Sequence, residues 1–403
     1  MKALTKISIG FLALAAVALW FTSCSSEDVA QNGGGLNEKD QRVLLLSVNT
    51  GNLGTRSTTA LTADEKQIND MTVGIYDKTG NYRVVAKLAS STADKEASGS
   101  TDGTFTTTSG VKVQVVTSTL QKDDQVLVAV NRGTAAFTSK PNSPTDFSNV
   151  TMDATTALQF KASSTDIDAT KFPKFGTATL PAGSNSTFTT TVNVKNLVSK
   201  VTLEDLKVDF SGPYANASFT PSDIFLLNVP NKLAFSATGQ ASTSTPSFAY
   251  LNGTNIDKSG GTAGTKTAVL AKTITGAPAL SSASGGTASY AAQPILYTIP
   301  NSDTSNKTIL VIAGKFKKDA SATAEETVYY PLALNEDYLS NPSGTAADGG
   351  TKSQTLAGKN YKCKVVIKTI GASNPWVTTG PQTAVLTVSV DDWEDAAQTT
   401  TFE

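Results

Sequence analysis

The residues that usually carry catalysis are almost absent from this chain. Its 403 residues include no histidine and only two cysteines, Cys24 and Cys363. Without histidine, Ser-His-Asp catalysis, Cys-His catalysis and the usual zinc sites are excluded. Cys363 shares one face of an apolar segment with Tyr361 and Val365, so we expect a small buried core residue. The sequence therefore predicts a protein that is no enzyme and has no cofactor.

The charged residues indicate neither a nucleic-acid partner nor a metal site. The formal net charge is −1, from 33 basic and 34 acidic residues, which provides no general attraction to nucleic acid. The densest acidic cluster, Asp391-Asp392-Trp393-Glu394-Asp395, has carboxylates that could bind calcium but lacks the EF-hand spacing. We interpret this cluster as a solvated turn.

Cys24 is placed for a different chemistry, the attachment of lipid. Lys2 and Lys6 precede an apolar run of fifteen residues, 7–21. This run is too short to span a bilayer and is typical of a signal peptide. Cys24 follows small residues at the expected cleavage point, an arrangement that resembles a bacterial lipobox. We predict that residues 1–23 are a signal peptide and that the Cys24 thiol carries lipid, palmitate included. Several acyl chains would anchor the precursor in the outer membrane.

One arginine is placed for proteolysis. Arginine occurs only at positions 42, 56, 83 and 132. Arg56 lies in a polar loop that contains two glycines, and proteases cut preferentially in such loops, whereas Arg83 and Arg132 lie in or directly after predicted strands. We predict cleavage between Arg56 and Ser57 by a trypsin-like, arginine-specific protease. The alternative is that Arg56 is an ordinary surface arginine.

Residues 42–48 form a predicted β-strand that this cleavage would remove. Its apolar residues alternate between two faces, with Leu44, Leu46 and Val48 on one and Val43 and Leu45 on the other. A β-domain that loses a strand keeps an open groove. Such a groove can accept a strand from another molecule, because backbone groups and apolar side chains are left without partners.

Residues 383–390, near the other end of the chain, form the predicted donor of such a strand. The apolar residues again alternate, with Ala384, Leu386, Val388 and Val390 on one face and Val385 on the other. The alternative is that this segment is a permanent strand of its own domain.

The rest of the chain predicts an all-β protein with few short helices. Charged residues make up only 17%, and the abundance of Thr, Ser, Val, Ala and Gly suits β-sandwiches with long polar loops. Strand patterns occur at 71–76, 82–88, 111–116, 125–130, 187–194, 198–210, 224–229, 309–316, 328–334, 361–370 and 383–390. Residues 90–102, 236–291 and 341–353 have loop composition. Since roughly 380 residues exceed one ordinary core, we place a domain boundary near Lys195.

Several motifs, taken in order, resemble the fimbrillins of Bacteroidales, the FimA-type major fimbrial subunits of type V pili. The first are the lipobox, the apolar strand and the arginine-containing loop. The internal motifs lie at 71–76, 126–131, 198–201 with 219–224, 329–332 and 360–362. The closing motifs are 386–390, Trp393 and a final short strand at 399–402. The resemblance covers essentially the whole chain.

This resemblance implies two tandem β-sandwich-like (transthyretin-like) domains, 57–195 and 196–403, after a lipidated propeptide at 24–56. It also implies an order of assembly. The chain would be exported as an outer-membrane lipoprotein precursor and cut after Arg56. The segment 383–403 of the next subunit would then fill the vacated groove by donor strand exchange, which produces a cell-surface fimbrium.

We therefore expect a structural stalk subunit of a fimbria, or pilus, that functions in cell adhesion. Its partners would be copies of itself, the tip and anchor subunits, and the processing protease, and the sequence names no host receptor. A cleavable first strand together with a carboxyl-terminal donor favours the stalk. The alternatives are a tip or accessory adhesin of the same superfamily and a monomeric glycan-binding surface lipoprotein.

Overall fold

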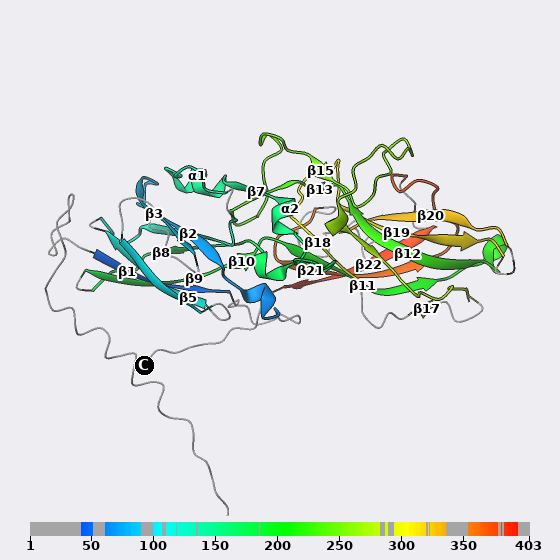
Figure 1. Cartoon of the computed structure of the whole chain (residues 1–403), viewed down its shortest axis with the longest axis horizontal. Coiled ribbons are helices and arrows are strands. Elements are labelled where there is room, and N and C mark those ends of the chain that lie inside the picture. Colours follow the sequence, from blue (N-terminus) through cyan, green and yellow to red (C-terminus); the bar gives the residue numbers. More distant parts are fainter. Residues whose placement is uncertain are drawn as a thin grey trace, which may run out of the picture. The chain divides into compact units, whose positions relative to one another are not determined.

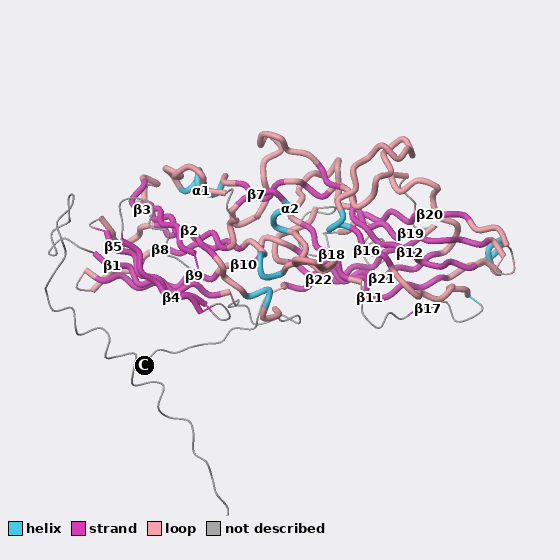
Figure 2. Tube along the Cα trace, viewed as in Figure 1, coloured by secondary structure: helices cyan, strands magenta, loops and turns pink. Residues whose placement is uncertain are grey.

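The computed structural model describes residues 42–50, 61–89, 100–106, 110–117, 119–133, 136–184, 186–282, 287–288, 294–319, 321, 323–335, 354–377, 380 and 383–393. Strands dominate the fold (Figure 1). The helices are short pieces within long loops (Figure 2). The prediction of an all-β protein with few short helices is confirmed. Within the described ranges, no helix has the length and apolar character needed to cross a membrane.

The first half of the chain is built mainly from β-strands. They are β1 (Arg42–Asn49), β2 (Asp70–Tyr76), β3 (Tyr82–Ala89), β4 (Ser100–Thr106), β5 (Gly110–Thr117), β6 (Gln125–Val130), β7 (Thr151–Asp153), β8 (Lys174–Thr179), β9 (Thr187–Asn193) and β10 (Lys195–Asn196). The helices of this half are η2 (Asp64–Lys66), α1 (Pro144–Ser148), α2 (Ala154–Ala157) and η3 (Ala169–Lys171).

The second half has longer strands and longer connections. Its strands are β11 (Ser199–Val208), β12 (Ser218–Leu227), β13 (Val229–Pro230), β14 (Lys232–Ala234), β15 (Tyr250–Leu251), β16 (Ala271–Thr273), β17 (Thr287–Ala288), β18 (Ile295–Thr298), β19 (Ile309–Lys317), β20 (Glu326–Ala333), β21 (Lys359–Ile367) and β22 (Ala384–Asp392). Its short helices are η4 (Gly212–Tyr214) and η5 (Ala268–Leu270).

Strands β1 to β10 contribute two sheets, which we call the N-terminal sandwich. One sheet has the order β4-β5-β1-β9 and the other the order β10-β8-β6-β2-β3. Apolar side chains of both sheets meet in one cluster, in which Leu44, Leu46 and Val48 of β1 join residues of β2, β3 and β6. This packing follows from the period-2 alternation of the strands, because each sheet turns one apolar face inward.

Strands β11 to β22 contribute the main sheets of the C-terminal sandwich. One contains β17-β11-β21-β22, with β18 also paired to β11, and the other has the order β16-β12-β19-β20. Their facing side chains belong to a large apolar cluster that includes Cys363, Leu310 and Tyr330. Pro221 is tolerated inside β12 because the register with β19 shifts between Pro221 and Asp223, at a bulge.

The two sandwiches share apolar packing. The cluster that fills the C-terminal sandwich also contains Leu61, Phe147 and Phe172 of the first half. Phe137 packs against Phe235 with ring centroids 5.4 Å apart, and β14 pairs with β7 across the halves. The two halves are therefore in direct contact through aromatic rings and a short strand pair.

The sequence patterns located most strands but missed some. Residues 100–102 were expected in a loop and belong to β4, and β8 was not predicted because 174–179 contains two threonines and a glycine among few apolar residues. The hairpin of β2 and β3 is confirmed by their antiparallel register. The predicted strand at 399–402 lies outside the described residues.

Candidate functional site

Strand β1 is an interior strand of its sheet. It pairs antiparallel with β5, from Arg42 opposite Thr117 to Val48 opposite Val111. On its other side it pairs parallel with β9, from Val43 opposite Thr187 to Asn49 opposite Asn193. Strand β1 lies between β5 and β9 in the sheet order, and Figure 1 shows the three strands in the same part of the molecule. Removing β1 would therefore expose the backbone groups of two strands at once.

The side chains of β1 divide between the core and the surface as the alternation predicts. Leu44, Leu46 and Val48 are 0%, 1% and 0% exposed, whereas Leu45 on the opposite face is 39% exposed. Fully burying each of the three inward side chains is worth about 1.5–3 kcal/mol. Fixing the backbone costs about 1–2 kcal/mol per residue, so the stability of β1 in the groove depends on these three contacts together with pairing on both edges.

The predicted processing residues and the lipid site are not in the described part. Arg56 and Ser57 fall in 51–60 and Cys24 falls in 1–41, and both segments lie outside the described residues. The chain on either side is held firmly. Val194 N donates to Asn49 O at 2.8 Å. Beyond residue 60, Thr62 N donates to Glu65 Oε2 at 2.7 Å and Glu65 N donates to Thr62 Oγ1 at 3.3 Å, a reciprocal pair around the start of η2.

The other arginines are held by partners within the fold. The Arg83 Nε atom lies 2.7 Å from Asp124 Oδ2. Arg132 N donates to Asp70 Oδ1 at 2.8 Å, and its guanidinium is also near that carboxylate. Arg42, in β1, donates to the Leu120 carbonyl. Since a protease needs several residues of extended chain around the scissile bond, these ordered arginines are poor substrates.

Strand β22 carries the predicted donor residues and is packed in its own subunit. It pairs antiparallel with β21, from Lys359 opposite Asp392 to Ile367 opposite Ala384, and it is the last strand of its sheet (red beside orange in Figure 1). The donor residues on the inner face, Ala384, Leu386 and Val388, are buried in the core, and Val385 is buried on the other face. Val390 is only partly buried.

Within the part of the chain that the structure describes, the groups considered for catalysis or metal binding do not form a cluster. Cys363 is a fully buried free thiol, and burial raises its pKa well above the ordinary value, so the predicted core role is confirmed. Among the described residues, no group of three or more His, Cys, Asp or Glu side chains could hold a metal ion. Asp391 and Asp392 belong to β22 rather than to a turn, which corrects that part of the acidic-turn prediction.

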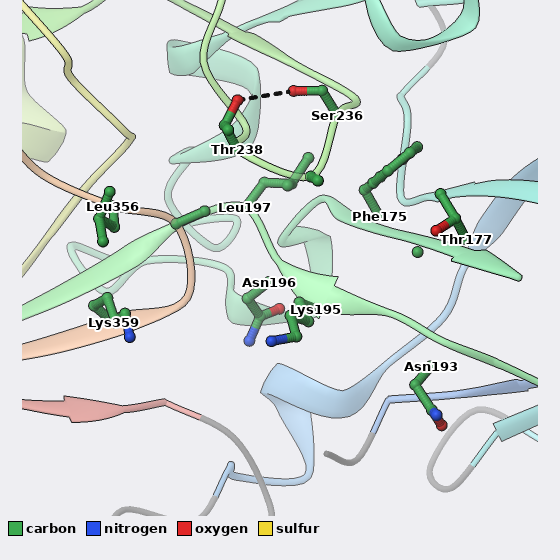
Figure 3. Close-up of a pocket in the computed structure, with 13 residues that line it drawn as sticks. Phe175, Thr177, Asn193, Lys195, Asn196, Leu197, Ser236, Thr238, Leu356 and Lys359 are labelled. Atoms are coloured by element: carbon green, nitrogen blue, oxygen red, sulfur yellow. Dashed lines mark hydrogen bonds between the residues drawn. The ribbon is translucent and has the colours of Figure 1, made fainter. Parts of the chain in front are cut away.

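A cavity of about 470 Å³ lies where the two halves meet (Figure 3). Its wall combines Phe175 and Thr177 of β8, Asn196 of β10, Thr238 and Lys359. Ser236 Oγ and Thr238 Oγ1 lie 3.3 Å apart on its rim. The lining mixes polar side chains such as Asn196 with apolar ones such as Leu197 and Leu356, and the Phe175 ring in its wall is buried.

The sequence did not predict two features of the structure, the partner of β1 and the contacts of Trp393. The parallel pairing of β1 with β9 has no local signal, because parallel partners are distant in sequence. The contacts of Trp393 with Phe172 and Tyr297 were also missed, since single aromatic residues in loops or short strands do not indicate their partners.

The comparisons with known proteins bear on the fold. No protein-family model and no curated protein matches the chain. A candidate cell adhesion protein from Bacteroides eggerthii matches with a TM-score of 0.58 and 18% identity, over 90% of this chain and 100% of that chain. A candidate cell adhesion protein from Parabacteroides distasonis matches with a TM-score of 0.59 and 15% identity, over 88% and 99%.

A fimbrilin (FimA) from Porphyromonas gingivalis W83 matches with a TM-score of 0.58 and 16% identity, over 88% of this chain and 99% of that chain. Each match extends over nearly the full length of both proteins. The chain therefore has the same overall fold as these bacterial adhesion and fimbrial proteins.

Proposed function

We propose that this protein is a structural subunit of a surface fimbria that polymerises by strand exchange. The precursor is an outer-membrane lipoprotein that carries lipid on Cys24, and an arginine-specific protease cuts it between Arg56 and Ser57. The lipidated segment and β1 then leave together, and the subunit joins an extracellular fimbrium with other copies of itself and with tip and anchor subunits. The shared fold with a fimbrilin supports this assignment.

The position of β1 is the observation that carries the proposal. It pairs on both edges and fills the core with Leu44, Leu46 and Val48, yet its connection to β2 passes through 51–60, which contains Arg56. A strand that fills the core and is joined to the domain by a segment with the proposed protease site is suited to replacement. The incoming strand would restore both backbone ladders and the apolar contacts.

Strand β22 of a second subunit is the proposed replacement. We propose that it enters in the direction of β1, antiparallel to β5 and parallel to β9, so that both hydrogen-bond patterns are kept. In one register, side-chain volume is nearly conserved, because Leu386, Val388 and Val390 take the positions of Leu44, Leu46 and Val48. In a register that starts two residues earlier, Ala384 takes the position of Leu44 and leaves a cavity.

A second candidate is a tip or accessory subunit of the same kind of fimbria. The packing of β22 favours it, because Ala384, Leu386 and Val388 already fill the core of their own subunit. Such a subunit would accept a strand after cleavage and donate none. Deleting 383–403 cannot separate the two candidates cleanly, since the deletion would also remove these core side chains.

The test is to treat the precursor, residues 25–403, with an arginine-specific protease. A stalk subunit gives a new amino terminus at Ser57 and an SDS-resistant ladder, and Arg56→Ala prevents both. A clean cut at Ser57 without a ladder, but with binding of an added β22 peptide, supports the tip or accessory subunit. A chain that is degraded, or that stays monomeric and binds no peptide after cutting, contradicts both assignments and leaves the glycan-binding alternative.

A further inference from the structure

The end of β22 lies in a cluster of three aromatic rings, Phe172, Tyr297 and Trp393, which we call the Trp393 cluster. The Trp393 ring centroid lies 5.7 Å from that of Phe172, at an interplanar angle of 71°. It lies 5.7 Å from that of Tyr297, at 32°. The Phe172 and Tyr297 centroids are 5.0 Å apart. Trp393 is fully buried, so this large side chain is enclosed at the point where β22 ends.

The rings that enclose Trp393 come from different sandwiches. Phe172 lies two residues before β8 of the N-terminal sandwich, and Tyr297 belongs to β18 of the C-terminal sandwich. The Trp393 backbone is also held, because its N–H donates to Gly358 O at 2.9 Å. Both sandwiches therefore contribute to the retention of one end of β22.

The wall formed by Phe172 is held by hydrogen bonds to residues that follow the predicted cut. The Phe172 carbonyl accepts from Lys174 Nζ at 3.0 Å and from Asn131 Nδ2 at 2.9 Å. Asn131 also donates to Gln67 O at 3.0 Å, which fixes the segment that follows the predicted cut. These bonds lie downstream of Arg56, so cleavage leaves them in place.

The opposite end of β22 is tied to the body of the subunit. Thr383 N donates to Gly380 O at 2.9 Å, and Lys368 N donates to Thr383 O at 2.8 Å. Within the described sheet, β22 has β21 as its single neighbour. If β22 is to reach another molecule while Thr383 stays attached, the strand must leave its own subunit beginning at the Trp393 end.

We infer that Trp393 is a positioning residue that locks the donor strand in its own subunit. The indole must leave the space between Phe172 and Tyr297 before β22 can be donated, and cleavage after Arg56 does not release it. Assembly then has two separate controls: the cut opens the groove of the acceptor, and withdrawal of Trp393 frees the strand of the donor. This inference rests on the proposed function.

The first test measures the lock without any assembly. Hydrogen exchange of the β22 amides is followed in the uncut precursor, with Trp393→Ala compared with Trp376→Ala. Trp376 is a suitable control because it is the other tryptophan of residues 25–403. Its indole N–H donates to Ile256 O at 2.7 Å, and it packs against a separate apolar cluster that contains Phe225 and no residue of β22. We expect exchange at least tenfold faster in Trp393→Ala only. Equal rates in the two variants overturn the lock.

A second variant covers the case in which Trp393→Ala does not fold. Tyr297→Leu removes one ring of the Trp393 cluster and leaves the donor sequence unchanged. Faster β22 exchange in this variant supports the lock, and exchange at the wild-type rate overturns it.

The second test follows Trp393 during assembly. In precursor that carries Trp376→Phe, Trp393 is the sole indole of residues 25–403. We expect the emission of a buried indole before and after the cut, and an altered emission maximum and acrylamide accessibility when ladders form. Unchanged emission in ladders overturns the lock. The lock and the stalk function can fail separately. If Trp393→Ala speeds β22 exchange but no ladder forms under any condition, the lock is supported and the stalk function is contradicted.

Discussion

Replacing Leu46 by alanine tests whether β1 is held by its inward face and must leave for assembly. Leu46 is 1% exposed within the apolar cluster of the N-terminal sandwich, whereas its neighbour Leu45 is 39% exposed on the outer face. A buried Leu→Ala change costs about 2–5 kcal/mol, and an exposed one usually changes stability by about 0.5 kcal/mol. Leu45→Ala is therefore a matched control with the same chemistry in the same strand.

The assay has two stages. Urea unfolding of the uncut precursor measures the loss of stability, which we expect to be several-fold larger for Leu46→Ala than for Leu45→Ala. After cleavage, β1 is held by non-covalent contacts alone, so weaker contacts hasten its departure. A loss of 2 kcal/mol corresponds to about a 30-fold change, and we expect ladders of Leu46→Ala to form faster by up to this factor.

Two results would refute this reasoning. Equal destabilisation by the two variants would show that the faces of β1 are not divided between core and surface as described. A destabilised Leu46→Ala precursor that forms ladders at the wild-type rate would show that β1 does not have to leave, or that its departure is not limiting.

Three further predictions concern other parts of the molecule. Val390→Asn should leave the monomer folded, because Val390 is only partly buried there. If Val390 occupies the Val48 position in the acceptor, the same change should reduce ladder yield at least tenfold. Native gels measure folding of the monomer, and SDS gels measure ladder yield. Cys363 should resist alkylation in the native protein and react once urea unfolds it, since the thiol is buried and its pKa is raised; rapid native alkylation would contradict its placement. Burial lowers the pKa of Lys174 to about 7, so between pH 7 and the ordinary lysine pKa the unfolded chain binds more protons. Stability should therefore rise with pH in this window, by at most about 1.4 kcal/mol per pH unit, and Lys174→Met should flatten that slope in urea titrations.

Local patterns in the sequence predicted much of this fold. Alternation over 42–48 and 383–390 identified two strands and the side chains on each face, and the structure buries Leu44, Leu46 and Leu386 accordingly. Cys363 was placed in the core for the same reason. The period of two is a property of the strand backbone, so it can be recognised without knowing which strands are neighbours.

The partners of these strands were decided by the tertiary structure. The sequence does not indicate that β1 lies between β5 and β9, or that β22 occupies the edge of its own sheet beside β21. It also did not indicate that Trp393 meets Phe172 and Tyr297. Strand order and aromatic contacts join residues that are far apart in the chain, and many pairings satisfy the same alternation. Only the packing of all the strands around common cores selects one of them.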